Sequence, residues 1–314
     1  MSDWQAIEWF DFQTRMRGFV NIDKPKGMTS SDVVVIVRGI LRRATSQKHK
    51  VGHLGTLDPQ GTGVLPIAVG TATRLFDYLQ DKTKIYQATF VFGKTTDTLD
   101  SDGVVTEASN VLPTIEQIDD VLPKLCGDID QIPPMYSAKS VGGQRAYDLA
   151  RKGIEVELKS KRVRIDDIKR IDDGNGIAHL QNGDKKLDKN EHAFEIVCSG
   201  GTYIRSIARD MANALGSVAY MSSIRRIKNG AFDISVSVTL EEFEKDPIRY
   251  LKNIEECLPD FPRFDLPENL ISKVINGVQV QCECPWGYFL TFAQGEILGI
   301  GECVDGKLKM RVRL

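Results

Sequence analysis

The chain has 314 residues, of which 41% are hydrophobic and 27% are charged, a composition typical of a soluble globular protein rather than a disordered one. No run of about 18 apolar residues occurs, so the sequence predicts no membrane-spanning helix, and the first 17 residues lack the pattern of a secretory signal. The formal net charge of −2 argues weakly against a strongly basic nucleic-acid binder.

The predicted elements begin with a strand at residues 18–22, followed by a turn at 23–27 that contains proline and glycine. Thr29, Ser30 or Ser31 is expected to cap a helix that runs to about Arg43, although its β-branched residues also permit a strand. Residues 51–70 are rich in glycine and are predicted to form a structured loop. A short helix is predicted at 72–79 and a strand at 85–92.

The second half of the chain alternates helices and strands. Residues 94–103 are predicted as a polar loop, 114–125 as a helix, 146–152 as a helix and 163–171 as a strand. Residues 172–190 are polar and predict a hairpin tip or a mobile loop. A strand at 193–198 and an amphipathic helix at 204–215, closed by Gly216, follow.

The chain is expected to divide into four parts. Residues 1–17 form an N-terminal extension, 18–250 a large domain, 251–267 a proline-containing linker and 268–314 a small β-rich domain. Six cysteines are scattered, and in a large cytosolic chain they are expected to be reduced. Cys282, Cys284 and Cys303 suggest zinc, but a fourth ligand is missing from the pattern, so no metal is predicted.

Basic residues gather in three short runs, within 38–50, 145–164 and 225–228. Each run is either an ordinary solvated face or part of one phosphate-binding surface. The third run contains Arg225, Arg226 and Lys228.

The densest unusual segment surrounds Asp58, at residues 52–66, where four glycines and two prolines flank one aspartate. Such a rigid loop holds a carboxylate still, as a nucleophile requires, but an aspartate that only stabilises its own turn is the alternative. The glycine spacing matches neither a phosphate-binding loop of nucleotide triphosphatases nor a dinucleotide fingerprint, so no nucleotide cofactor is predicted.

Residues 52–65 read Gly-His-Leu-Gly-Thr-Leu-Asp-Pro-Gln-Gly-Thr-Gly-Val-Leu, and this segment resembles the catalytic loop of the TruB family of pseudouridine synthases. Only Gly61, where alanine is usual, departs from the family pattern. Residues 23–30, 84–86, 131–138, 145–147 and 198–205 resemble further family segments in the same order. Gly200 stands where a lysine is common, so any contact that this lysine makes is absent here.

The resemblance implies an α/β (α+β) fold with a mixed, largely antiparallel sheet flanked by helices, and a PUA-like RNA-binding domain at 268–314. It implies Asp58 as the catalytic carboxylate of an isomerase that converts uridine-55 in the TΨC loop of tRNA to pseudouridine after flipping the base out. Whether the carboxylate attacks C6, attacks C1′ or promotes a glycal route is left open. The reaction is redox-neutral, so no cofactor is expected.

The resemblance also implies roles for other residues. Arg205 is expected to keep Asp58 ionised in a closed site, the alternative being a surface arginine in the first turn of its helix. Tyr86 is expected to stack on the flipped uracil. The remaining candidates are Tyr203 as a wall and Ile224 as a floor of the pocket, His53 as an RNA contact, and Lys24 with Pro25 as support for the catalytic loop.

The expected partner is the TΨC stem-loop of tRNA, bound by a cytoplasmic monomer that needs no membrane and no obligatory protein partner. Three rival hypotheses are a guide-RNA-dependent enzyme of the same family, a non-catalytic RNA-binding protein and a hydrolase that uses Asp58. The last lacks a recognisable second carboxylate.

Overall fold

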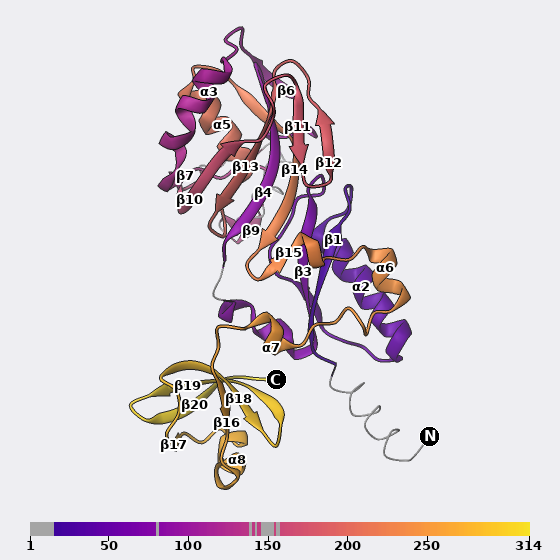
Figure 1. The fold of residues 1–314 in the computed structure, drawn as a ribbon, viewed down its shortest axis with the longest axis vertical. Helices are drawn as coiled ribbons and strands as arrows, with labels where there is room; N and C mark the ends of the chain where they lie inside the picture. Colours follow the sequence, from indigo (N-terminus) through magenta and orange to yellow (C-terminus); the bar gives the residue numbers. More distant parts are fainter. Residues whose placement is uncertain (1–15, 80–81, 138–139, 142, 146–153, 155–157) are drawn as a thin grey trace.

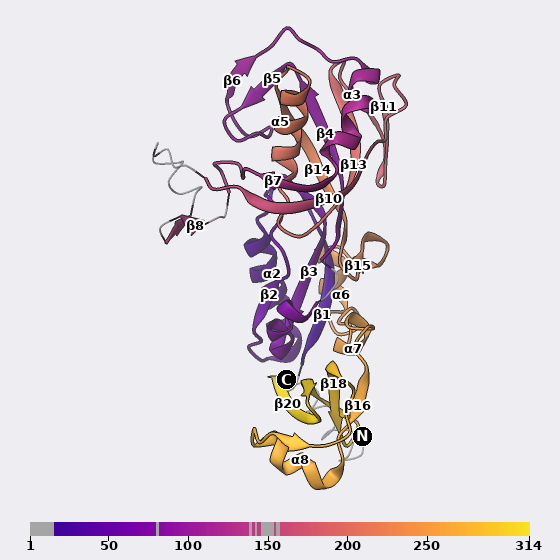
Figure 2. The same ribbon diagram turned by 90° about the vertical axis from the view of Figure 1, so that its left-hand side faces the viewer.

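The computed structural model describes residues 16–79, 82–137, 140–141, 143–145, 154 and 158–314. The molecule is elongated, with one large sheet and its helices forming most of its length and a small second sheet at the C-terminal end (Figures 1 and 2). Most of the predicted N-terminal extension and all of the predicted helix at 146–152 lie outside the described residues. Within the described part, no helix is long and apolar enough to cross a membrane.

The main sheet has nine strands in the described part of the chain, in the order β1-β3-β14-β4-β13-β10-β7, with β2 beside β3 and β15 beside β14. The strands are β1 (Gly18–Lys24), β2 (Val51–His53), β3 (Thr62–Val69), β4 (Lys84–Phe92), β7 (Gly127–Gln131), β10 (Lys161–Arg170), β13 (Glu191–Cys198), β14 (Ala219–Asn229) and β15 (Phe232–Asp233). Within it β3 and β14 pair in parallel and the other pairs are antiparallel. This arrangement confirms the predicted mixed, largely antiparallel sheet.

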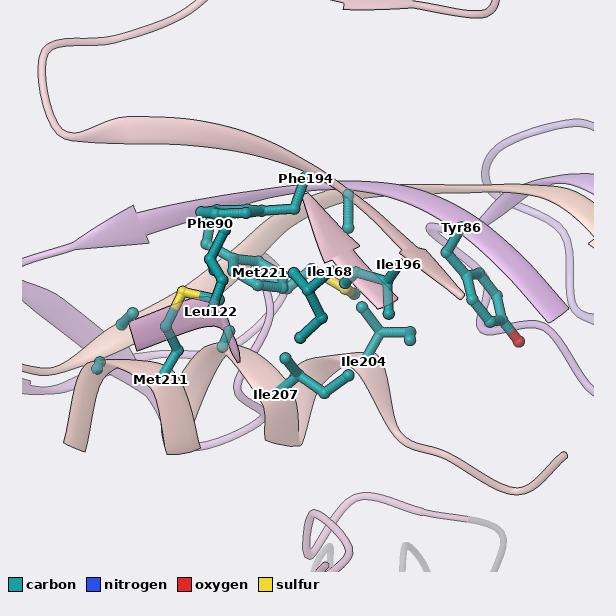
Figure 3. Packing of buried hydrophobic residues seen from close by; sticks show 14 of the residues in the cluster. Tyr86, Phe90, Leu122, Ile168, Phe194, Ile196, Ile204, Ile207, Met211 and Met221 are labelled. Carbon is teal, nitrogen blue, oxygen red and sulfur yellow. The ribbon is translucent and has the colours of Figure 1, made fainter. Parts of the chain in front are cut away.

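Helices cover the sheet in two groups. Helix α5 (Ile204–Ala214) packs its apolar face, including Ile207 and Met211, under β4, β13 and β14, and Figure 3 shows this layer. Helix α3 (Ile115–Val121) and the 3₁₀ turn η3 (Leu122–Leu125) join the same cluster. At the other end of the sheet, α2 (Ser30–Thr45) and α6 (Leu240–Lys245) pack on β1 and β3.

The predicted helix after the first strand is confirmed, with Thr29 as its N-cap. The Thr29 hydroxyl accepts from the Asp32 N–H and the Asp32 carboxylate accepts from the Thr29 N–H, which forms a capping box. Val33, Val37 and Leu41 are fully buried on one face of the helix.

The prediction that residues 51–70 form a loop is wrong at both ends, because β2 and β3 occupy them. Every residue of β3 after Thr62 is buried, so the strand shows no alternation of apolar and polar side chains. Because β3 contains a glycine and a proline, its composition resembles that of a loop, and this explains the wrong prediction.

Shorter elements complete the large domain. They are η1 (Gly70–Arg74) and η2 (Phe76–Tyr78), which replace the predicted helix at 72–79, and β5 (Lys94–Thr96), β6 (Val105–Ala108), β8 (Ser140–Val141), β9 (Gln144–Arg145), β11 (Ile177–Leu180), β12 (Gly183–Lys186) and η4 (Ile234–Val236). Strand β5 lies in the segment predicted as a polar loop. The β11–β12 hairpin fits the hairpin alternative for residues 172–190.

The C-terminal sheet has the order β16-β18-β19-β20-β17. Its elements are β16 (Arg263–Asp265), α8 (Glu268–Ile275), β17 (Val280–Gln281), β18 (Gly287–Ala293), β19 (Glu296–Val304) and β20 (Lys307–Arg313). Helix α7 (Ile254–Cys257) and β16 lie inside the range expected as a linker, so that segment is ordered. Phe292 and Ile300 share a buried cluster with Phe19 and Phe232, so one core joins the two sheets.

Asp172 connects the β11–β12 hairpin to the main sheet. Its contacts predict that the stability of the fold depends on pH. Its carboxylate is 2% exposed, pairs with Arg170 at 2.5 Å and accepts from the Ala193 N–H at 3.1 Å. Burial raises the pKa of this carboxyl, but contacts with His192, Ala193 and Arg170 together hold it below the ordinary value of 3.8. The stabilisation is therefore present above about pH 4 and is lost as the pH falls below that.

We expect the free energy of unfolding to fall between about pH 5 and pH 2, and the Asp172→Asn variant to be less stable at pH 7 but to lose less over that range. Urea unfolding at a series of pH values measures both slopes. The matched control is Asp184→Asn, which removes an exposed carboxylate of the same hairpin. Parallel curves for wild type and Asp172→Asn would contradict the assignment.

Candidate active site

Asp58 lies in the loop between β2 and β3, and the backbone of this loop is held on both sides of it. The Ser30 hydroxyl, at the start of α2, donates to the Leu57 carbonyl at 2.9 Å and accepts from the Leu57 N–H at 2.8 Å. The Gly61 N–H donates to the Asp58 carbonyl at 2.9 Å and closes a turn. The carboxylate itself remains 42% exposed, so it is held in place and is still accessible.

Lys24 joins the turn after β1 to the Asp58 loop. Its ammonium group is fully buried and donates to the carbonyls of Pro25 at 2.9 Å, Met28 at 2.6 Å and Pro59 at 3.1 Å. Burial lowers the pKa of Lys24 to about 8, while the nearby Asp58 carboxylate acts in the opposite direction. These contacts fit a supporting role for Lys24 and Pro25.

Five of the residues singled out in the sequence line one cavity of about 280 Å³. Asp58 comes from the loop, Tyr86 from β4, Ile224 from β14, and Tyr203 and Arg205 from the start of α5. Segments far apart in the chain therefore meet at this point.

His53, Lys24 and Pro25 do not line this cavity. His53 lies on β2, and its buried Nδ1 atom has no hydrogen-bond partner among the described residues. Burial lowers the pKa of this imidazole, and the charge of Arg226 adds to the effect.

The Arg205 guanidinium bridges two carboxylates. Its Nη2 lies 2.9 Å from Asp58 Oδ2, and its Nη1 lies 3.1 Å from Asp100 Oδ2. The same two nitrogens donate to the carbonyls of Tyr136 at 3.0 Å and Thr98 at 2.8 Å. Only 7% of the side chain is exposed, so the alternative of a surface arginine is excluded.

Arg226 is a site residue that the sequence analysis missed, because it was grouped with Arg225 and Lys228 in a basic surface run. It is fully buried on β14, directly opposite Tyr86 on β4. Its guanidinium donates to the carbonyls of Val64 at 2.7 Å, Thr56 at 3.3 Å and Gly55 at 3.0 Å. It therefore fixes the Asp58 loop to the sheet and cannot bind phosphate at the surface.

Two other charged residues are also less exposed or more strongly paired than predicted. Arg225 is paired with Asp23 at 2.7 Å. Asp100 lies in the segment predicted as a polar loop, yet it is 7% exposed and contacts Arg205. No spacing signal in the sequence marks either Asp100 or Arg226, since each is defined by its partner across the fold.

The Tyr86 side chain lies at the edge of the large core cluster, with its ring apart from the packed residues (Figure 3). Burial raises the pKa of its hydroxyl, and the nearby charge of Arg226 opposes this shift. The ring lines the cavity that holds Asp58. Tyr203 is held from the other side, because Gln131 accepts from its N–H at 2.8 Å and donates to its carbonyl at 3.1 Å.

Gly63 permits the close approach of β3 to β14, and we expect its replacement by alanine to lower the stability of the fold. Its φ is +96°, and a Cβ atom there would lie 2.2 Å from the Arg226 carbonyl oxygen. We expect Gly63→Ala to lower the free energy of unfolding by more than about 2 kcal/mol, because strain and a backbone clash add. The matched control is Gly27→Ala, where φ is +88° but nothing lies within 4 Å of the new Cβ.

The Gly27→Ala variant carries only the backbone strain, so it should lose about 1 kcal/mol. Urea unfolding at pH 7 measures both variants. Equal losses in the two would show that the contact with β14 contributes nothing.

The site combines a rigid, accessible carboxylate, a guanidinium bridge and a buried tyrosine hydroxyl. A fixed, accessible carboxylate in direct contact with a guanidinium has the arrangement that a carboxylate nucleophile requires. Among the described residues, no group of three or more His, Cys, Asp or Glu side chains is arranged to hold a metal ion.

Comparison with known protein families identifies the family of the chain. Residues 42–204 match the model of the TruB family pseudouridylate synthase N-terminal domain, and residues 205–271 match the tRNA pseudouridylate synthase B C-terminal domain. The chain belongs to the TruB family. It is therefore a pseudouridine synthase, an isomerase.

Individual TruB relatives match most of the chain. The tRNA pseudouridine synthase B of Clostridium kluyveri is 36% identical over 303 residues, which cover 94% of this chain and 98% of that protein. The protein of the same name from Lactobacillus acidophilus is 41% identical over 273 residues, which cover 85% and 88%.

Solved structures with the same fold are more distant in sequence. An H/ACA RNP bound to a substrate RNA containing 2'-deoxyuridine gives a TM-score of 0.64 at 20% identity and covers 97% of this chain and 86% of that chain. An archaeal box H/ACA sRNP Nop10-Cbf5 complex gives 0.63 at 20% identity, with 97% and 88% covered. At this identity the likeness is one of fold.

Proposed function

We propose that this TruB-family chain converts uridine-55 in the TΨC loop of tRNA to pseudouridine, with Asp58 as the carboxylate that starts the reaction. The observation that carries the proposal is the contact of Asp58 with Arg205 inside a cavity lined by Tyr86. The relatives named tRNA pseudouridine synthase B support tRNA as the substrate.

The chemistry needs few groups. The N1–C1′ bond of the uridine breaks, the uracil turns, a C5–C1′ bond forms, the proton on C5 leaves and N1 takes up a proton. Nothing is oxidised or reduced, so the reaction needs no cofactor. Asp58 acts as a nucleophile toward the base or the sugar, or promotes loss of the uracil, and then becomes free again for the next turnover.

The other cavity residues take distinct roles in this proposal. Arg205 pairs with the Asp58 carboxylate and holds it in the cavity. Tyr86 stacks on the flipped uracil, and its hydroxyl assists removal of the C5 proton. Tyr203 and Ile224 form the wall and floor that hold the base, and His53 contacts the RNA outside the cavity.

The small C-terminal domain, proposed at residues 268–314, supplies a second contact with the RNA. Four basic side chains alternate along β20 and are exposed: Lys307, Lys309, Arg311 and Arg313. A row of cations on one strand suits a phosphate backbone. We propose that the chain acts in the cytoplasm as a monomer, without a guide RNA or an obligatory protein partner.

The test is to map pseudouridine in an unmodified tRNA transcript after incubation with the purified full-length chain and no added cofactor. The expected result is one new pseudouridine, at position 55. Modification at a different uridine would overturn the substrate position. Tight binding without modification, relieved by adding a guide RNA and partner proteins, would overturn independent action.

A further inference from the structure

Three cysteine side chains gather in the C-terminal domain. Cys282 and Cys284 lie in the segment between β17 and β18, and Cys303 lies on β19. All three line one open surface pocket, which shares no described residue with the cavity that holds Asp58. Each is a free thiol in this structure. The proposed reaction uses none of them, so the cluster needs an explanation of its own.

The backbone turns two of the thiols toward the same side of the chain. The Cys282 N–H donates to the Gly306 carbonyl at 3.1 Å, which continues the pairing of β17 with β20. Cys282 and Cys284 are half-buried and pack against the core cluster of this domain, whereas Glu283 between them is exposed. This alternation is that of an extended segment, in which side chains two residues apart face the same way.

Cys284 is close to both of the other thiols. Burial raises the pKa of the Cys284 thiol well above its ordinary value, and the neighbouring thiols of Cys303 and Cys282 raise it further. A thiol of this kind stays protonated at neutral pH, so Cys284 is a poor first nucleophile. Of the other two, Cys282 is half-buried and Cys303 is only 5% exposed, so a reagent reaches Cys282 first.

The Cys282–Cys284 pair lies at the surface of the domain and can be bridged. Trp286, two residues beyond Cys284, is 88% exposed, so solvent reaches this segment. Cα atoms two residues apart are separated by at most about 7 Å in an extended chain, and a disulfide requires about 4.4–6.8 Å. Residues 282–285 have no regular secondary structure, so a slight bend brings the two sulfurs to bonding distance.

We propose that Cys282 and Cys284 form a reversible disulfide by exchange with a small organic disulfide, RS–SR. The Cys282 thiolate attacks one sulfur of RS–SR, the S–S bond of the reagent breaks, and the leaving RS⁻ takes up the proton that Cys282 released. The Cys284 sulfur then attacks the Cys282 sulfur of this mixed disulfide, and its proton passes to the second RS⁻ as that group leaves. In sum, two protein thiols are oxidised to one disulfide, and one RS–SR is reduced to two RSH.

The test treats the reduced full-length chain with a small excess of 2-hydroxyethyl disulfide, blocks the remaining thiols with N-ethylmaleimide and maps each cysteine by peptide mass. We expect a Cys282–Cys284 disulfide in the wild-type chain. Cys284→Ser should instead keep the mixed disulfide on Cys282, at a level at least about tenfold above that in the wild-type chain, because no thiol displaces the reagent. Cys282→Ser should form no disulfide.

Two controls make the pairing specific. Cys303→Ser changes the third thiol of the pocket and should form the Cys282–Cys284 disulfide as the wild-type chain does. Cys126, a half-buried thiol of the large domain, serves as an internal comparison that gains at most a mixed disulfide. Thermal melting checks that each reduced variant is folded. Mixed disulfides that persist on Cys282 and Cys126 alike in the wild-type chain, or a disulfide that includes Cys303, would overturn the proposal.

Reversibility has its own measurement. Excess 2-mercaptoethanol should return the oxidised chain to free thiols at Cys282 and Cys284, because a bond between residues so close in the chain is strained and exposed, and such disulfides are more easily reduced than structural ones. Thiol mapping after this treatment follows the reversal. A bond that survives it would be a permanent cross-link, and the exchange reaction would be refuted.

Discussion

Replacing Asp58 with asparagine is expected to lower kcat for pseudouridine formation by at least about 1000-fold while tRNA affinity changes less than about threefold. The amide cannot act as an anionic nucleophile, yet it has the size of the carboxylate and still accepts from Arg205. The carboxylate is 42% exposed, so the substitution does not disturb a packed core. Single-turnover mapping of pseudouridine measures the rate, and filter binding measures the affinity.

Two further variants make the Asp58 result specific. Asp58→Ala excludes slow conversion of the asparagine back to aspartate. Asp184→Asn removes an exposed carboxylate on the β11–β12 hairpin and should keep wild-type activity. An Asp58→Ala enzyme that keeps a tenth of wild-type activity would show that another group starts the reaction.

Replacing Arg205 with lysine is expected to lower kcat by about 100-fold or more, although the positive charge is kept. The guanidinium contacts Asp58 and Asp100 and donates to two carbonyls at the same time. A single ammonium cannot reproduce these directions, because only the planar fork bridges two carboxylates. Asp58 would then lose its fixed orientation, and a small displacement of a nucleophile has a large effect on rate.

The control for Arg205 lies one turn further along α5. Arg209 pairs with Asp210 at 2.8 Å and donates to the Ile132 carbonyl, so Arg209→Lys makes the same change of side chain outside the cavity. It should lower kcat less than about threefold. Thermal melting of both variants separates loss of folding from loss of catalysis. A fully folded Arg205→Lys enzyme with wild-type kcat would remove Arg205 from the mechanism.

Local patterns predicted most of the elements but not all. Helices α2 and α5 carry apolar residues at helical spacing, and β4 and β13 alternate or are rich in β-branched residues, so each was predicted within a few residues. Strand β14 was not predicted, because its residues Ser222 to Lys228 read as a polar and basic segment. The strand exists because β3 and β4 pair with it on either side.

The sequence by itself indicated the family of the chain and the loop that carries Asp58, the proposed catalytic carboxylate. A lone aspartate among glycines and prolines, followed in the chain by the segments that carry Tyr86 and Arg205, was enough to name the family and five of the residues that line the cavity. These features are local, since the motif and the helix period are set by neighbouring residues.

Only the tertiary structure decided which charges act together. Arg226 was placed in a basic surface run and Asp100 in a polar loop, yet both are buried, because sheet register and loop packing bring their partners to them. A buried charge persists only where hydrogen bonds or an opposite charge replace water, and those partners come from distant segments. The bridge from Asp58 through Arg205 to Asp100 is therefore a property of the fold and not of any motif.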